Sequence, residues 1–513
     1  MMSILRERGA WAALLMALLV VAAGCGSTGQ VATPSESPTA GFGSDVAVSD
    51  VLPPGAHVTK EGKVVNKKGK VIGTAEEFGL EKTKSGKYVA EDDSGRGKPK
   101  RSRGAGPANP ATDPSELAGE IKLGVVVPSG NAGAAFGVNA NYGDNNQRYA
   151  QAMIEEINAT GGLAGRKVVG VYAEMDQTDQ SQADETREGN EICTRLTEDE
   201  HVFLVVTFVL WARHSFDCYA RHQTPIWPSV NNIDAEGMQE LQPWLLPSLW
   251  MSYTRMAKLM PVAYQQAGAI TEKMGLVGFD LPDLRRATEE ILIPGLEARG
   301  GVVLDKIYVP PEYQSAASIA QAVLRFNQQG IDRVVFFAPG GAAWLIFGRE
   351  ADAQDYRPGY NVSSYDNANY IEGLLPRSQL EKTVGAGYRV QYDVTESAQP
   401  DARPIEEECW RIMKERAGVE INNRNQTPNP GLHYCDAFWL LQTALSPARG
   451  KQFDPPDVAG LYFSVGSRFA PSLMLESFFT PKRTDGVSLY APFKFYDGCG
   501  CFKYTSNYRR MSF

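Results

Sequence analysis

Histidine is scarce in this sequence. Only five histidines occur among 513 residues, and none of them belongs to an established metal-ligand motif. His214 and His222 lie eight residues apart on an expected helix, which is two turns and too far for both to bind one metal ion. The motifs H-E-x-x-H, G-x-S-x-G and G-x-x-x-x-G-K-[ST] are also missing. We therefore expect no catalytic residue, metal or cofactor, with an exported hydrolase built from carboxylates that meet only in the fold as the weaker alternative.

Positive charge is in deficit as well. Lys and Arg number 51 against 60 Asp and Glu, which gives a formal net charge of −9. An acidic chain is poorly suited to nucleic acid or anionic lipid as its main partner. We expect a small molecule as the partner and no nucleic acid.

The N-terminus has the pattern of a targeting segment. Arg6 and Arg8 precede the apolar run AWAALLMALLVVAAG, which is too short for a comfortable membrane span. The small residues before Cys25 resemble a bacterial lipobox, although Ala22 stands where that pattern prefers Leu. This resemblance implies that residues 1–24 are a signal peptide and that Cys25 is lipidated. The alternative is an ordinary secretory signal, and both interpretations predict an exported protein.

Residues 25–117 have few large apolar side chains and many Gly, Ser, Pro, Lys and Glu. Such a composition buries too little surface to offset the entropy of ordering, so we interpret the segment as a flexible, low-complexity tether. Within it, 60–74 and 84–90 alternate apolar residues with Lys around Gly and could form a small hairpin. Because a lone hairpin is marginal in water, disorder is the preferred interpretation.

Beyond Cys25 the chain has six cysteines, an even number in an exported protein, and three disulfides are expected. Fifteen pairings are possible, and the pairings local in sequence fit best. A soft-metal site competes with the disulfide at the last pair, where only Gly500 separates the two thiols. The preferred pairs are Cys193 with Cys218, Cys409 with Cys435, and Cys499 with Cys501.

From Ile121 onward, apolar strand patterns alternate with amphipathic helix patterns. The run 121–127 is continuously apolar, as in a strand covered on both faces. A helix follows, with Asp144 as its expected cap, and Gly161 and Gly162 end it. Further strands are predicted at 167–173, 202–206, 225–227, 275–279, 302–309 and 333–338, and further helices near 181–197, 212–222, 253–267 and 284–299. A last helix has Ile319, Val323 and Phe326 on one face and ends at Gly330. This order predicts parallel sheets in two similar α/β lobes.

The sequence resembles the type I periplasmic binding proteins, in the branch of ABC-transporter solute receptors for branched-chain amino acids and amides. The resemblance is carried by IKLGVVVPSG (121–130), AMIEEINATGGLAGRKV (152–168) and GIDRVVFFAPG (330–340). It implies two Rossmann-like lobes with parallel sheets, joined by a multi-strand hinge and closing on a solute. We expect lobe one to comprise 118–251 and about 388–470, and lobe two 252–387 and about 471–513. The resemblance also implies a monomer that works with an ABC permease outside the cytoplasm.

Ligands of open α/β sheets bind beyond the carboxyl ends of the strands, and these ends supply the candidate site residues. Each candidate has a structural alternative: the serines suit turns, and Trp211 suits packing. For Asp280 we prefer helix capping, and for Asp366 a ligand contact of the kind that the resemblance implies for an amino-acid ammonium group. The candidates are Ser129, Trp211, Ser229 and Asn231 from lobe one, and Asp280, Tyr365 and Asp366 from lobe two.

The residues after the third and fourth strands differ from those of amino-acid receptors. TFVLW (207–211) and PSVNN (228–232) replace small, hydroxyl-rich residues, and the bulky side chains favour an amide, an aromatic acid or a lipid-like solute. The predicted function is a lipid-anchored solute-binding protein that delivers its solute to an ABC importer. A receptor for a membrane signalling partner is the alternative on the same scaffold.

Overall fold

The computed structural model describes residues 57–65, 69, 71–75, 80–82, 86–90, 119–130, 145–177, 182–209, 213–230, 233–310, 316–420 and 430–511. The signal peptide and Cys25 lie outside these residues, as do Asp144, Trp211 and Asn231. Among the described residues, no helix combines the length and the apolar character that a membrane span requires.

Two short sheets occupy the region expected to be disordered. β1 (His57–Val58), β2 (Lys63–Val65) and β3 (Val71–Thr74) form an antiparallel sheet, and β4 (Leu80–Lys82) pairs with β5 (Tyr88–Ala90). The preference for disorder is therefore wrong for these segments. A third strand and the burial of Val64 add stabilising contacts that a lone hairpin lacks.

The first lobe is built on a parallel sheet with the strand order β7-β6-β8-β9. Its strands are β6 (Glu120–Ser129), β7 (Lys167–Asp176), β8 (Leu204–Thr207) and β9 (Ile226–Pro228). The connecting helices are α2 (Asn145–Ala159), α3 (Gln182–Thr194) and α4 (Arg213–Arg221), followed by α5 (Ala235–Glu240). The predicted buried face of α2 is confirmed, and Gly161 and Gly162 follow the helix with φ of 108° and 69°.

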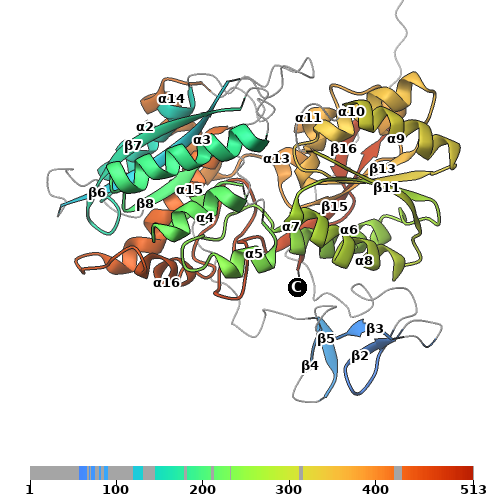
Figure 1. Cartoon of the computed structure of the whole chain (residues 1–513), viewed down its shortest axis with the longest axis horizontal. Coiled ribbons are helices and arrows are strands. Elements are labelled where there is room, and N and C mark those ends of the chain that lie inside the picture. The colour runs from blue at the N-terminus through green and yellow to red at the C-terminus, as the bar shows by residue number, and fades with distance from the viewer. Residues whose placement is uncertain are drawn as a thin grey trace, which may run out of the picture. The chain divides into compact units, whose positions relative to one another are not determined.

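Three late helices pack with the first lobe. They are α14 (Pro404–Ala417), α15 (Pro430–Leu445) and α16 (Asp457–Phe463). Figure 1 shows α14 and α15 beside α2, and Arg416 of α14 forms an ion pair of 2.9 Å with Glu156 of α2, 260 residues away. The chain thus returns to its first sheet long after leaving it.

The second lobe contains the larger sheet, in the order β11-β10-β12-β13-β14-β15-β16, with β17 paired to β15. The strands β10 (Met274–Phe279), β11 (Val303–Val309), β12 (Arg333–Phe337), β13 (Gly359–Ser363) and β14 (Val384–Gly387) are parallel. β15 (Leu489–Tyr496), β16 (Cys501–Tyr504) and β17 (Arg509–Arg510) add antiparallel pairs.

The longer helices of this lobe are α6 (Tyr253–Gln266), α9 (Ala316–Gln328) and α10 (Ala342–Ala353). The helix predicted near 284–299 consists of α7 (Pro282–Ala287) and α8 (Ile293–Glu297), joined by a π-helical turn at Thr288–Leu292. The short helices α11 (Ala368–Ile371) and α12 (Arg377–Leu380) complete the lobe, and α13 (Val390–Asp393) lies in the segment that leads out of it.

Three linking segments connect the sheets: 241–252, 388–403 and 464–488. One continuous cluster of buried apolar residues includes Val125 of β6, Met251 of the first linking segment and Leu276 of β10. Parts of the linking segments therefore belong to the core.

All three predicted disulfides are present. Cys193 of α3 is bonded to Cys218 of α4, Cys409 of α14 to Cys435 of α15, and Cys499 to Cys501, the first residue of β16. The metal alternative for Cys499 and Cys501 is wrong, because each sulfur is already bonded to the other.

Candidate functional site

The carboxyl ends of the first sheet bring two candidate serines into ordered positions. Ser129 ends β6 and is half-buried, and its carbonyl accepts a 2.9 Å hydrogen bond from the Gln177 amide. Ser229 follows β9, is buried, and donates its amide to the Thr207 carbonyl at 2.8 Å. Both contacts use backbone atoms, and a ligand role for the hydroxyls stays a prediction.

Asp280 does not cap a helix. Leu281 is the N-cap of α7, and Pro282 follows it at the first helical position. The half-exposed Asp280 carboxylate instead accepts a 2.5 Å hydrogen bond from Arg285. The capping interpretation of Asp280 is therefore wrong, because the helix begins one residue too late for this carboxylate.

Asp366 takes part in a capping box, in which Ser363 is the N-cap and Asp366 stands three residues after it. Its Oδ2 atom accepts hydrogen bonds from the Ser363 amide at 2.8 Å and the Ser363 hydroxyl at 3.1 Å. The bond from the Ser363 amide is one half of the capping box at the 3-10 turn Ser364–Asp366, and the Ser363 side chain, which accepts from the backbone of the turn, is the other half. The carboxyl is fully buried, and this burial raises its pKa to about 8 against the lowering effect of the Ser363 hydrogen bonds. A ligand contact by Asp366 stays a prediction.

Tyr365 lies at the junction of the lobes. Its hydroxyl donates to the carbonyl of Met251 in the first linking segment, and its ring stacks on Trp250 with centroids 5.2 Å apart and an interplanar angle of 4°. The side chain is buried, so it fixes the first linking segment to the second lobe.

Four residues that the sequence did not single out as ligand candidates meet beside Tyr365, and we call them the Arg389 cluster. Trp250 comes from the first linking segment, Arg389 and Tyr392 from the second, and His433 from α15 of the first lobe. The guanidinium carbon of Arg389 lies 4.7 Å from the Trp250 ring centroid and 4.3 Å from that of Tyr392. Arg389 Nη2 is 3.3 Å from His433 Nε2, which also lies 2.8 Å from the Tyr392 hydroxyl.

The charge of this cluster resides on Arg389. Burial, aided by the neighbouring guanidinium, lowers the pKa of His433 well below its ordinary value, so the imidazole is neutral near pH 7. Arg389 itself is only 1% exposed. The faces of the Trp250 and Tyr392 rings stabilise this buried cation.

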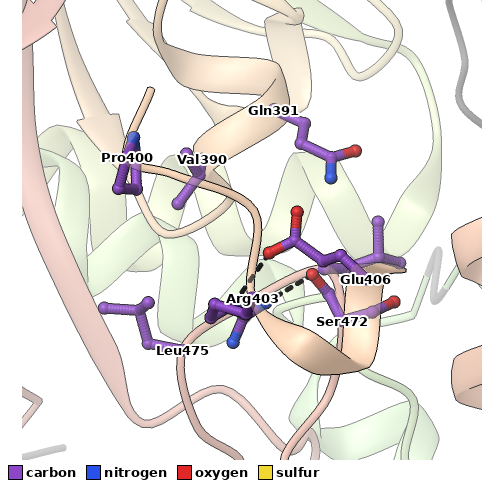
Figure 2. A pocket seen from close by; sticks show the side chains of 8 residues that line it. Val390, Gln391, Pro400, Arg403, Glu406, Ser472 and Leu475 are labelled. Carbon is purple, nitrogen blue, oxygen red and sulfur yellow. Dashed lines mark hydrogen bonds and ion pairs between the residues drawn. The ribbon is translucent and has the colours of Figure 1, made fainter. Parts of the chain in front are cut away.

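A small pocket lies close by in sequence, at the start of α14. Figure 2 shows Arg403 near Glu406 and Ser472, and Arg403 Nε donates to Glu406 at 2.8 Å. The pocket volume of about 10 Å³ is at the lower limit for one water molecule, and the pocket is too small for an organic solute.

Ion pairs also connect the two lobes away from the linking segments. Arg286 of α7 pairs with Asp234, the N-cap of α5, at 2.6 Å, and with Asp283 at 2.8 Å. Arg213 of α4 lies 3.7 Å from Asp283. These contacts join the carboxyl-end loops of both sheets, so the described conformation has the lobes in contact at this edge.

Two parallel α/β sheets with three linking segments define a type I periplasmic binding protein fold. The model of the periplasmic binding protein family matches residues 120–399, more than half of the chain, and the protein belongs to this family. The recognition, the fold class and the prediction that the protein is not an enzyme are thereby confirmed, because the family binds solutes and is not catalytic.

Solved structures support the fold at low sequence identity. Two solute-binding proteins of ABC transporters from Rhodopseudomonas palustris, in complex with 3,4-dihydroxybenzoic acid and p-hydroxybenzoic acid, are 14% and 16% identical, with TM-scores of 0.55 and 0.56. Each alignment covers 76% of this chain. It covers 98% of the protein with 3,4-dihydroxybenzoic acid and 97% of the protein with p-hydroxybenzoic acid. A leucine-binding protein from Thermotoga maritima is 14% identical, with a TM-score of 0.53, and covers 75% of this chain and 98% of its own. No curated protein matches the sequence.

Arg389 stands two residues after the carboxyl end of β14, a strand that the sequence analysis did not predict, and Trp250 follows no strand directly. Recognising 384–387 as a strand would have made Arg389 a candidate, whereas no periodicity in the first linking segment points to Trp250. Only the return of the chain through α15 brings His433 to them.

Proposed function

We propose that the protein is a lipid-anchored receptor outside the cytoplasm that captures a small organic solute between its lobes and delivers it to an ABC permease. The observation that carries this proposal is the family match over 120–399 together with the two-sheet fold. Solved proteins of the same fold bind aromatic acids and leucine, which defines the first solutes to test. Capture requires only that the solute bind the closed conformation more tightly than the open one.

A thermal-shift screen of the full chain tests solute capture. The panel comprises 4-hydroxybenzoate, 3,4-dihydroxybenzoate, leucine, amides, ureas and short lipids. A solute at one hundred times its dissociation constant is expected to add about 2.7 kcal/mol to the free energy of unfolding, and mass spectrometry should recover it unchanged. Stabilisation by none of these solutes would count against capture, and so would recovery of a chemically altered solute.

The lipid anchor has its own test. Replacing Cys25 by serine removes the thiol that the lipid would modify, and the protein should move from the membrane fraction to the soluble fraction of the producing cells. Mass spectrometry of the wild-type N-terminus should show a diacylglycerol-modified Cys25. Cys499→Ser with Cys501→Ser serves as the matched control and should leave the membrane fraction unchanged. An unmodified N-terminus in the wild type would contradict the anchor.

A further inference from the structure

Arg389 has buried hydrogen-bond donors without partners. The side chain is 1% exposed, and its Nε and Nη1 atoms have no hydrogen-bond partner among the described residues. The indole Nε1 atom of Trp250, whose ring lies against the guanidinium, is likewise buried and unpartnered there. Buried charged groups are normally paired, since an unpaired charge in a protein interior is strongly destabilising.

The neighbours of Arg389 do not supply the missing acceptor. The Trp250 and Tyr392 rings attract the cation through their faces, and His433 is neutral and contacts only Nη2. In the part of the chain that the structure describes, no ion pair involves the guanidinium. Its charge is therefore not matched by a nearby fixed carboxylate in direct contact.

Asp393 is hydrogen-bonded to the Arg389 backbone, and both of its carboxylate oxygens already accept hydrogen bonds. Oδ1 accepts from the Ser364 hydroxyl at 2.6 Å, and Oδ2 accepts from the Tyr504 hydroxyl and the Arg389 backbone amide, both at 2.8 Å. Burial raises the pKa of Asp393 to about 7, although these hydrogen bonds and the Arg389 charge lower it. Asp393 thus orders the backbone at Arg389 and leaves the side-chain donors open.

The unpartnered groups of the cluster share one chemistry. Nε and Nη1 of Arg389 and Nε1 of Trp250 can only donate hydrogen bonds, and an ionised carboxylate can only accept them. The surroundings are aromatic, since Trp250 stacks on Tyr365, which in turn stacks on Phe337 with centroids 6.2 Å apart. The location of the cluster also suits a solute held between the lobes, because its residues come from two linking segments and from α15 of the first lobe.

From this geometry we infer that Arg389 and Trp250 bind the carboxylate of an organic acid held at the lobe junction. This inference rests on the proposed function and names the chemical class of its solute. A solute of this class satisfies the donors of both side chains, and its binding is coupled to the linking segments because Arg389 and Trp250 belong to them.

Calorimetric titration of the full chain with matched acids and amides tests the inference. The probes are 4-hydroxybenzoate with 4-hydroxybenzamide and leucine with leucinamide, which differ in the charge of the carboxyl end. The wild type should bind at least one acid at least about thirty-fold more tightly than its amide. Arg389→Gln should weaken binding of that acid by a similar factor and leave the amide unchanged.

Arg357→Gln is the matched control variant. Arg357 is a partly exposed arginine that precedes β13, at the amino ends of the strands, and pairs with Asp352 and Asp355. This variant should bind the acid as the wild type does. If Arg389→Gln does not fold, as judged by circular dichroism, the comparison of acid with amide in the wild type still tests whether the site requires a carboxylate.

The possible outcomes separate the inference from the proposed function. An acid bound equally well by the wild type and Arg389→Gln overturns the inference, and so does an amide bound as tightly as its acid. Capture only of solutes without a carboxylate also overturns it, while the proposed function stands. Binding of no solute from the wider panel overturns the proposed function itself.

Discussion

Asp485→Ala is expected to lower the free energy of unfolding by about 3–5 kcal/mol, because it leaves the Arg255 guanidinium buried without its counter-ion. Asp485 is fully buried in the third linking segment and forms an ion pair with Arg255 of α6, whose side chain is 8% exposed. The carboxylate also accepts from the backbone amides of Ser252 at 2.8 Å and Val487 at 2.9 Å. The substitution thus removes the charge that holds the start of α6 to the third linking segment.

Urea unfolding of the full chain measures this effect. Asp280→Ala removes one member of the half-exposed Arg285 pair and is the control, with an expected loss of no more than about 1 kcal/mol. The double variant Arg255→Met with Asp485→Leu should recover part of the loss, since it removes both charges together. A loss in Asp485→Ala that is no larger than in Asp280→Ala would show that the buried pair contributes little.

Asp366→Asn is expected to stabilise the protein, and the gain should increase with pH. The carboxyl has a pKa of about 8 in the fold, raised by burial, against about 3.9 in the unfolded chain. The folded state therefore holds a proton that the unfolded state releases between these values, and wild-type stability falls as pH rises from about 4 to about 8. Asparagine has no proton to lose, so the gain should reach several kcal/mol above pH 8 and be small at pH 4.

Thermal unfolding of the wild type and Asp366→Asn between pH 4 and pH 9 checks this prediction. Asp305→Asn is the control with the opposite sign. Burial raises the pKa of Asp305, but hydrogen bonds from Arg325 and Gln329 outweigh this effect and lower it overall. The Asp305 carboxylate stabilises the fold above the pKa that Asp has in the unfolded chain, and this stabilisation is lost in acid. Asp305→Asn should therefore be less stable than the wild type at pH 8. Parallel pH profiles for the wild type and Asp366→Asn would rule out Asp366 as the source of the dependence.

Local sequence patterns were sufficient to predict the order of the helices and strands. Continuous apolar runs predicted buried parallel strands, and the stripe through Met153 and Ile157 predicted the buried face of α2. The disulfide pairs also followed from sequence proximity, because each joins elements that are close along the chain. The small sheets at 57–90 were misjudged, since a third strand adds contacts that a single hairpin pattern does not reveal.

The roles of individual site residues were harder to predict. Asp280 and Asp366 both follow strands, and the sequence offers no way to tell which one caps a turn, because the choice depends on where the next helix begins. The position of Tyr365 after a strand makes it a ligand candidate in the sequence. Only the structure shows that its hydroxyl holds the first linking segment.

The sequence by itself determined the α/β alternation, the family and the covalent framework, because these depend on spacing along the chain. The tertiary structure alone decided the Arg389 cluster, because Trp250, Arg389 and His433 are brought together by three separate passages of the chain. It also decided the buried Arg255 and Asp485 pair, which lies 230 residues apart in sequence. Burial and charge pairing are properties of this packing, and no local pattern encodes them.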